Sequence, residues 1–342
     1  MNIFVIDYIC TSGHKFFNRI HIDALFRAGV SLSFISRRGY LEVSKSLPYY
    51  EIPEDYYLSQ EINQLGSIRY NYYDIKKLKY AERIVERAKP DAVIVLTYDA
   101  ISLAFFRVKC PTFVINHVNV DFLSFWYRNL TTKLFPKNYI HVCLSKRIHE
   151  YILSKLPRFQ SVYIPHGILN TTRLDHNRDN VIFCPITSSV DVPLLNDIIN
   201  NQSVVEYLLS KKIQFVIKTR LDIFKDIAPC FKLVKGYMDG DIYMKYVQNS
   251  IAIFLPYEKS FNFRVSGIFH EALSYNTPIL TSDIPTFNEY RDLILYEFQI
   301  DSPEKLLNTL QVIEKKIEYY QNLGSLDPSP YWKETINKYL AK

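Results

Sequence analysis

Short apolar runs of strand length alternate with longer stretches of helical periodicity along almost the whole chain. In the first half the apolar runs are NIFVID, VSLSFIS, DAVIVLT, CPTFVIN, YIHVCLS and SVYIP. The stretches between them include HKFFNRIHIDALFRAG, DIKKLKYAERIVERAK and SKRIHEYILSK, which have helical spacing. Strands that are apolar at nearly every position indicate a parallel sheet covered by helices on both faces. The sequence therefore predicts an α/β protein built on parallel sheets.

The alternation starts a second time after a polar segment, NTTRLDHNRDN at 170–180, which we interpret as a linker. The second series of apolar runs is VIFCPI, IQFVIKT, FKLVKGY, IAIFLPY, TPILTS and LILYEF. A chain of 342 residues also suggests two domains at roughly 100–200 residues each. We predict one domain over 1–168, a second over 176–326, and a final helix over 329–342. Because ligands bind outside the carboxyl ends of parallel strands, the two sheets are expected to face each other across a cleft.

Composition excludes several classes of protein. Hydrophobic residues make up 48% and charged residues 22% of the chain, which indicates a globular protein. No apolar run approaches the roughly 20 residues that cross a bilayer. The start, MNIFVIDYIC, lacks a basic region and is interpreted as a buried strand, not a signal peptide, so we expect a cytoplasmic protein. Five cysteines stand singly without C-x-x-C spacing, which predicts reduced thiols and no zinc site.

The formal charge of +6 is uneven along the chain. Residues 1–165 hold 22 Lys and Arg against 14 Asp and Glu, a balance of +8, and the remainder holds 19 against 21, a balance of −2. Such asymmetry favours an anionic partner for the first half, although a merely solvated basic surface would give the same count. Nucleic acid is the least expected partner, because the basic residues are spread along the first half and form no recognised motif.

One segment of the first half, FLSFWYRNLTTKLFPK at 122–137, interleaves aromatic residues with Arg128, Lys133 and Lys137. This pattern is typical of a surface that contacts an anionic membrane. An ordinary helix with a buried aromatic face would show the same pattern, so both interpretations stay open.

Several common catalytic motifs are missing. The sequence has no G-x-G-x-x-G after a strand and no G-x-x-x-x-G-K-[ST], which disfavours a dinucleotide oxidoreductase and a P-loop NTPase. It also has no G-x-S-x-G and no H-E-x-x-H. The DGD at 239–241 resembles a metal motif, but it lies just ahead of a helical pattern and is interpreted as a helix cap.

The segment FNFRVSGIFHEALSYNTPILTSDIPTFNEY at 261–290 carries the strongest functional signal. A helix is expected from about Ser266, with Arg264 just before it and Glu271 within its second turn. Unpaired N–H groups at a helix start attract anions, and Ser266-Gly267 would allow close approach. Arg264 has the fork geometry that suits phosphate, and Glu271 can accept hydrogen bonds from a ribose diol. This order fits a nucleoside diphosphate, whereas the alternative is a surface glutamate and a loop cation.

The chain here resembles the GT-B glycosyltransferases, especially the family-4-like branch. The segments that carry the resemblance are NIFVIDYICTSGHKFFNRIHIDAL, VYIPHG, KLVKGYMDGDIYMKYVQNSIAIFLPY, HEALSYNTPILTSDIPTFNEY and the terminal YWKETINKYL. The resemblance implies two Rossmann-like domains across a cleft, with the last helix crossing back onto the first domain. It also implies transfer of a sugar from a nucleotide-diphosphate donor, of UDP or GDP type, to a hydroxyl of a saccharide acceptor, with no separate cofactor.

On the donor side, Glu271 matches the second glutamate of the family's E-x7-E motif, which implies ribose binding. The first glutamate would fall at Phe263, so the sequence departs from the pattern there, and Glu258 would replace it only if the loop differs in length. The sequence PITSSVD stands where the family has a Gly-Arg turn. The other donor-side candidates are hydrogen-bond donors, strand-end cations and residues bordering the base, namely Ser188 and Ser189, Lys218 and Arg220, and Gly236 and Tyr237.

In the first domain, the turn TSGHK places Gly13 where the family's glycine turn approaches the donor, and His14 would face the sugar or the acceptor. His117, in VINHVNVD, stands where the family often has a residue beside the reacting centre. His117 or His14 is therefore the predicted general base, and Arg264 the predicted catalytic cation. Tyr98 and Asp99 are also expected to point into the cleft, whereas His166 in YIPHG is interpreted as structural.

The resemblance implies a retaining, metal-independent reaction. We expect the acceptor to be a lipid-linked saccharide of bacterial surface polysaccharide synthesis, with peripheral contact at the inner face of the cell membrane. Two alternatives stay open: a nucleotide-sugar epimerase of GT-B fold, which needs further acid and base carboxylates, and a non-catalytic sugar-binding protein.

Overall fold

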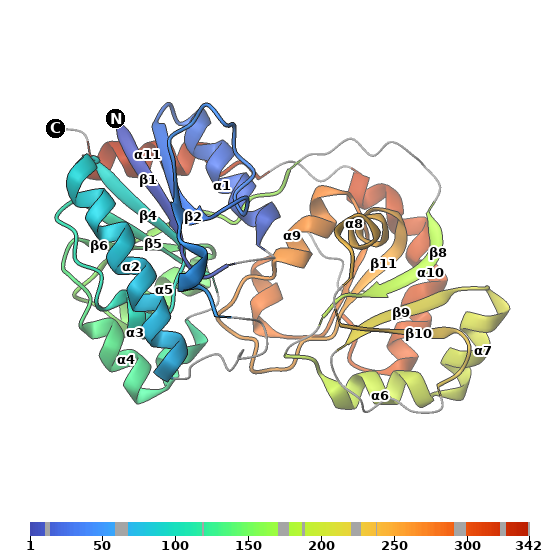
Figure 1. The fold of residues 1–342 in the computed structure, drawn as a ribbon. Helices are drawn as coiled ribbons and strands as arrows, with labels where there is room; N and C mark the ends of the chain where they lie inside the picture. Colours follow the sequence, from blue (N-terminus) through green and yellow to red (C-terminus); the bar gives the residue numbers. More distant parts are fainter. Residues whose placement is uncertain are drawn as a thin grey trace. The chain divides into compact units, whose positions relative to one another are not determined.

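The computed structural model describes residues 1–10, 14–58, 68–117, 120–169, 178–186, 189–219, 227–236, 238–290, 299–321 and 326–340. The chain divides into two compact units (Figure 1). Unit 1 comprises Met1–Gly167, Phe263–Val265 and Asp327–Lys342, and unit 2 comprises Ile168–Asn262 and Ser266–Leu326. Three residues near the middle of the second half, Phe263–Val265, thus pack with unit 1.

Unit 1 is built on a parallel sheet with the strand order β3-β2-β1-β4-β5-β6-β7. Six of its strands coincide with predicted apolar runs. The strands are β1 (Asn2–Asp7), β2 (Ser31–Arg37), β3 (Tyr49–Ile52), β4 (Ala92–Thr97), β5 (Thr112–Asn116), β6 (Tyr139–Cys143) and β7 (Gln160–Tyr163). The prediction omitted β3, because this short edge strand exposes Tyr50 and Glu51 and has no apolar run.

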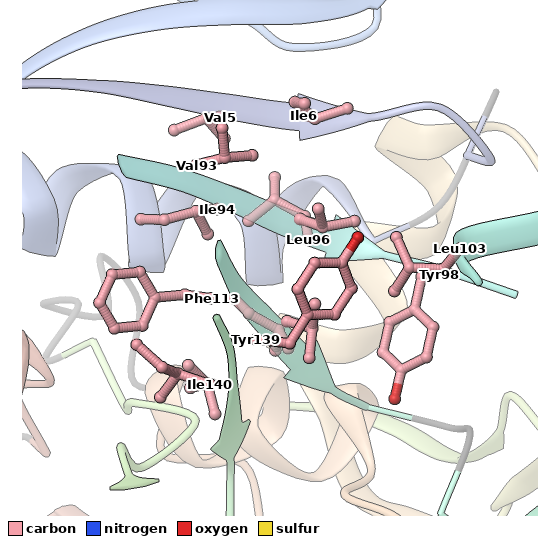
Figure 2. Close-up of a cluster of buried hydrophobic side chains, with 14 of the residues drawn as sticks. Val5, Ile6, Val93, Ile94, Leu96, Tyr98, Leu103, Phe113, Tyr139 and Ile140 are labelled. Atoms are coloured by element: carbon pink, nitrogen blue, oxygen red, sulfur yellow. The ribbon is translucent and has the colours of Figure 1, made fainter. Parts of the chain in front are cut away.

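The core of unit 1 lies on the central strands. Figure 2 shows Val5 and Ile6 of β1, Ile94 of β4 and Phe113 of β5 among the buried side chains. All six residues of β4 are buried, which requires that both faces of the sheet be covered. Burial of each such side chain stabilises the fold by roughly 1.5–3 kcal/mol.

In the part of unit 1 that the structure describes, helices and two short 3-10 turns lie between the strands, and one helix follows from the end of the chain. The first two helices have their predicted periodicity, although α2 begins six residues earlier than predicted. The helical elements are α1 (Lys15–Arg27), η1 (Glu54–Tyr56), α2 (Ile68–Ala88), α3 (Ala100–Leu103), η3 (Asp121–Ser124), α4 (Trp126–Lys133), α5 (Lys146–Lys155) and α11 (Ser329–Leu340).

The last helix, α11, packs against α1 and completes unit 1 (Figure 1). Trp332 is fully buried, and its Nε1–H donates to Nδ1 of His21 at 3.1 Å. The chain between the units is held close to this helix. Gly167 has φ +88, and a Cβ there would lie 2.6 Å from Cγ2 of Ile20 and 3.2 Å from Cδ of Pro328. Both the left-handed backbone and the lack of space therefore require glycine at this position.

Over its described residues, unit 2 has a five-stranded parallel sheet with the order β10-β9-β8-β11-β12. Its strands are β8 (Asp179–Cys184), β9 (Gln214–Thr219), β10 (Phe231–Lys235), β11 (Ser250–Leu255) and β12 (Ile279–Thr281). Its helical elements are α6 (Val192–Asn200), α7 (Gln202–Ser210), α8 (Gly240–Asn249), α9 (Gly267–Ser274), η4 (Pro285–Tyr290) and α10 (Pro303–Gln321).

Two predicted segments of unit 2 need comment. Asp179 and Asn180, the last two residues of the predicted linker, already belong to β8, and residues 170–177 lie outside the described residues. The predicted strand LILYEF also lies outside them. All five cysteines are unpaired thiols, as predicted, and only Cys110 is not fully buried. Among the helices that the structure describes, none has the length and apolarity to cross a bilayer.

Candidate functional site

The helix predicted near residue 266 is present in unit 2 as α9. Its apolar face is buried as expected through Phe269, Ala272 and Leu273. Ser266 is the N-cap: its Oγ accepts from the Phe269 N–H at 3.2 Å and bonds the Tyr257 hydroxyl at 3.0 Å. This buried hydroxyl thus satisfies the third amide of the helix, and the binding of an anion near Ser266 stays a prediction. The Gly267 and Ile268 amides precede that capped amide.

Glu271 lies one turn into α9 and is partly buried. Its Oε2 accepts a hydrogen bond from the hydroxyl of Tyr243, on α8, at 2.8 Å. Burial raises the pKa of Glu271 to about 7, and the bond from Tyr243 acts in the opposite direction. The carboxyl group therefore changes its charge near neutral pH.

Lys218, the predicted strand-end cation, lies near the end of β9. Its Nζ is 5.9 Å from the centroid of the Tyr243 ring. Lys218, Tyr243 and Glu271 are thus connected side chains from three different elements, and we call them the donor cluster. The sequence predicted Lys218 and Glu271 as site residues but not Tyr243, which contacts both side chains. Tyr243 stands 28 positions from Glu271, and no local pattern marks it.

Of the other residues that the sequence suggested on the donor side, some have a local structural role and the rest lie outside the described residues. Gly236 follows β10 with φ +80, and a Cβ there would meet nothing within 4 Å, so its left-handed backbone alone favours glycine. Asp239 caps α8, as predicted, by accepting from the Asp241 N–H at 2.9 Å. Ser189 has φ +54, and its carbonyl accepts from the Glu258 N–H at 2.9 Å. The other candidates lie outside the described residues: Gly13, Ser188, Arg220 and Tyr237.

Arg264 packs with unit 1 and has a carboxylate partner. Its Nε lies 2.5 Å from Oδ2 of Asp121, and the side chains of the two residues are 18% and 11% exposed. Oδ1 of Asp121 also accepts from the Phe263 N–H at 2.7 Å. The Phe263 ring stacks on Tyr151 with centroids 3.9 Å apart. The Arg264 guanidinium, which the sequence analysis predicts to bind a diphosphate, is therefore paired with the Asp121 carboxylate.

The two predicted base candidates, His14 and His117, come together in unit 1. Their ring centroids are 4.7 Å apart in an edge-on arrangement. The Phe17 ring centroid lies 4.9 Å from that of His117 and 5.0 Å from that of His166. The His166 side chain, interpreted from the sequence as structural, is buried. Burial lowers the pKa of His14, which favours the neutral imidazole that a general base requires.

Tyr98 and Asp99 do not project as predicted. Tyr98 is buried, and its hydroxyl donates to Oδ1 of Asn116 at 2.7 Å. Asp99 caps α3 by accepting from the Ile101 N–H at 2.8 Å and forms an ion pair with Arg128. These strand-end side chains satisfy neighbouring groups within unit 1. A cavity of about 10 Å³ beside Tyr98 and Arg128 has room for one water and for no sugar.

The segment around α4 exposes its aromatic residues. Trp126 is 77% and Leu134 58% exposed, Phe125 and Leu130 are exposed as well, and Thr132 is the only residue of α4 that is buried. The alternative of a buried aromatic face is therefore wrong for α4. Residues 100–149 also carry seven Lys and Arg but one acidic residue, Asp121. We call Phe125, Trp126, Leu130 and Leu134, with Lys133 and Lys137, the α4 surface.

Comparison with known proteins identifies the fold. No family model matches the sequence, and no curated protein matches it. Solved structures do match over the whole chain. The pneumococcal O-GlcNAc transferase GtfA, in complex with UDP and GlcNAc, matches with a TM-score of 0.65 at 10% identity, covering 100% of this chain and 99% of that one.

Two further structures are similar over the whole chain. WaaG, a glycosyltransferase involved in lipopolysaccharide biosynthesis, matches with a TM-score of 0.58 at 12% identity and covers 100% of both chains. The E. coli trehalose-6-phosphate protein bound with UDP-2-fluoro glucose matches with a TM-score of 0.63 at 10% identity, covering 100% of this chain and 99% of that one. The chain has the GT-B fold of these glycosyltransferases, with two units on parallel sheets, which confirms the predicted fold class.

Proposed function

We propose that this protein is a glycosyltransferase that moves a sugar from a nucleotide-diphosphate donor to a hydroxyl of a saccharide acceptor. The observation that carries the proposal is the donor cluster, where Glu271 lies one turn into α9 and a cation, Lys218, is connected to it through Tyr243. The GT-B fold supports it, since similar structures were solved with UDP or with a UDP-sugar analogue.

The donor would be recognised on unit 2. The ribose diol donates hydrogen bonds to the Glu271 carboxylate, whose Oε1 has no hydrogen bond among the described residues. The diphosphate rests against the amides of Gly267 and Ile268 at the start of α9, ahead of the amide that Ser266 caps, where the helix dipole is positive. Lys218 supplies positive charge near the same cluster.

The chemical step needs stabilisation of the departing diphosphate, which gains negative charge in the transition state. Preorganised N–H groups and cations aimed at that charge lower the barrier most. Lys218 and the α9 amides have this role in the proposal, and Arg220 is proposed to add a second cation. Arg264 is proposed to stabilise the diphosphate less than Lys218 does, because its guanidinium is already paired with Asp121. The reaction is proposed to retain anomeric configuration and to need no metal ion.

The acceptor is assigned to unit 1, which carries the basic excess. His117 or His14 is the proposed general base for the acceptor hydroxyl. The α4 surface has the combination of exposed aromatic and basic residues that binds anionic bilayers. A lipid-linked saccharide of bacterial surface polysaccharide synthesis, met at the inner face of the cell membrane, is therefore the proposed acceptor.

Calorimetric titration of the full chain with UDP, GDP, ADP and CDP tests the donor class. We expect UDP or GDP to bind with a Kd in the micromolar range, a typical affinity for such co-substrates, and the other bases to bind more weakly. If none of the four nucleotides binds, the proposal is wrong.

Product analysis with the sugar form of the winning nucleotide separates the enzyme classes. A glycosyltransferase releases the nucleoside diphosphate rapidly only when an acceptor is present. Without an acceptor it releases the nucleoside diphosphate slowly, by transfer of the sugar to water. Isomerisation of the nucleotide sugar without such release would instead establish an epimerase, and binding without any turnover would establish a sugar-binding protein.

A further inference from the structure

We propose that Tyr243 is a positioning residue for donor binding: its hydroxyl holds the Glu271 carboxylate in place, so that the remaining oxygen receives the ribose. The inference rests on the proposed function, because it concerns the same site. Its basis is the hydrogen bond that joins α8 to the carboxylate on α9, 2.8 Å from the Tyr243 hydroxyl to Oε2.

The ring that carries this hydroxyl is fixed on several sides. It packs edge-on against Phe183 of β8 with centroids 5.9 Å apart at 70°. Nζ of Lys218, from β9, lies 5.9 Å from the ring centroid. The start of α8 is anchored by the Asp239 cap, and the helix packs against β8, β11 and α9. A ring held by neighbouring strands presents its hydroxyl in one place, as a positioning group must.

The charged and titratable groups near Glu271 come from each neighbouring element. Tyr243 faces it from α8, and Nζ of Lys218, from β9, lies 5.9 Å from the centroid of the Tyr243 ring. Tyr257, after β11, bonds the Ser266 hydroxyl, and His270 on α9 bonds the Ser266 carbonyl. Burial raises the pKa of Glu271, and the bond from Tyr243 is the group that lowers it. Loss of that hydroxyl should therefore leave the carboxyl protonated at neutral pH.

The consequence concerns how the nucleotide is bound. An ionised carboxylate offers acceptor lone pairs on both oxygens, and Tyr243 occupies one of them on Oε2. Oε1 is left for the diol, to which it makes charge-assisted hydrogen bonds that are stronger than neutral ones. A protonated carboxyl group accepts more weakly and carries its own hydrogen. Donor affinity should then fall as pH falls through the Glu271 pKa, and Tyr243 sets where that fall occurs.

The test is Tyr243→Phe, which removes the hydroxyl and keeps the ring. Tyr246→Phe is the matched control, because Tyr246 is on the same helix and stacks on the same Phe183 ring with centroids 4.9 Å apart. Affinity for the nucleoside diphosphate that the wild type binds best is measured from about pH 5.5 to about pH 9. We expect the midpoint of the affinity profile to move up by about one pH unit in Tyr243→Phe and to stay in place in Tyr246→Phe.

Two further measurements distinguish a positioning role of Tyr243 from a general disruption of the binding site by the substitution. The 2′,3′-dideoxy form of the same nucleotide should bind wild type and Tyr243→Phe with the same pH profile, because it lacks the diol. The NMR signal of the Glu271 carboxyl carbon is assigned by comparison with Glu271→Gln. Its chemical shift should change with a midpoint near pH 7 in the nucleotide-free wild type and at a higher pH in Tyr243→Phe. An unchanged midpoint in both experiments would overturn the inference while leaving the proposed function intact. A wild type that binds no nucleoside diphosphate would overturn the proposed function itself.

Discussion

The Asp121 carboxylate holds Arg264 by an ion pair, with Arg264 Nε 2.5 Å from Asp121 Oδ2. Its other oxygen accepts from the backbone of Phe263 at 2.7 Å. Asp121, on η3, therefore binds the backbone of Phe263 and the side chain of Arg264, two of the three residues 263–265 that belong to unit 1. Because both side chains of the pair are mostly buried, solvent screens their attraction only weakly.

Asp121→Ala should lower the free energy of unfolding by about 2–3 kcal/mol, since it removes the carboxylate from a mostly buried cation and from a backbone N–H. Urea unfolding followed by fluorescence measures this loss. Asp283→Ala, at an exposed position, is the control and should change stability by less than about 0.5 kcal/mol. Equal effects of the two substitutions would show that the Asp121 pair contributes nothing to the fold.

The α4 surface should bind anionic bilayers. In sedimentation with vesicles, the full chain is expected to bind phosphatidylglycerol-containing vesicles and to bind pure phosphatidylcholine vesicles weakly, because the aromatic residues insert and Lys133 and Lys137 attract the headgroups. Trp126→Ala combined with Leu134→Ala should lower the binding at least about fivefold. The matched control combines Leu209→Ala with Ile242→Ala, two exposed apolar residues of unit 2. Equal loss in both double variants, or equal binding to both lipids, would refute a membrane role for this surface.

Acid should destabilise the fold through buried imidazoles. Burial lowers the pKa of His141 to about 4, from 6.5, while its Nδ1 lies 3.3 Å from Oδ1 of Asn116. The folded state therefore binds the proton less readily than the unfolded chain. The stabilisation is complete above about pH 6.5 and is lost as pH falls toward 4, by about 2 kcal/mol at pH 5.

The measurement for His141 is the change in unfolding free energy between about pH 7 and about pH 5, compared between wild type and His141→Gln. Buried carboxyl groups with a raised pKa, such as Asp7 and Asp74, act in the opposite direction, so only the difference between the two proteins isolates the imidazole. The variant should lose about 2 kcal/mol less than the wild type over this interval. An identical pH dependence in both proteins would mean that His141 is not the titrating group.

The fold was largely predictable because its strands are buried on both faces and appear in the sequence as apolar runs. The exception, β3, is a short edge strand with an exposed Glu51, so burial imposed no pattern on it. The position of α9 was predictable from its local cap, Ser266, and from its apolar spacing.

The site was less predictable, because its contacts join residues far apart in the chain. Asp121 and Phe263 are 142 positions apart, and Tyr243 and Glu271 are 28 apart, so neither pairing leaves a local signal. For Tyr98 and Asp99 the sequence signal was present but had another cause. Polar residues at a strand end suggested ligand binding, whereas Tyr98 donates a hydrogen bond to Asn116 and Asp99 accepts one from the start of α3.

The most direct test of the donor site is calorimetric titration of Glu271→Ala with the nucleoside diphosphate that the wild type binds best. Glu206→Ala is the matched control, since Glu206 is an exposed glutamate on α7 of the same unit whose Oε1 accepts only from Gln202 among the described residues. We predict that Glu271→Ala weakens binding at least about tenfold at pH 8, where the wild-type carboxyl is ionised, and that Glu206→Ala leaves it within about twofold. Unchanged affinity in Glu271→Ala would contradict the assignment of the ribose to this carboxylate, and with it the proposed donor site.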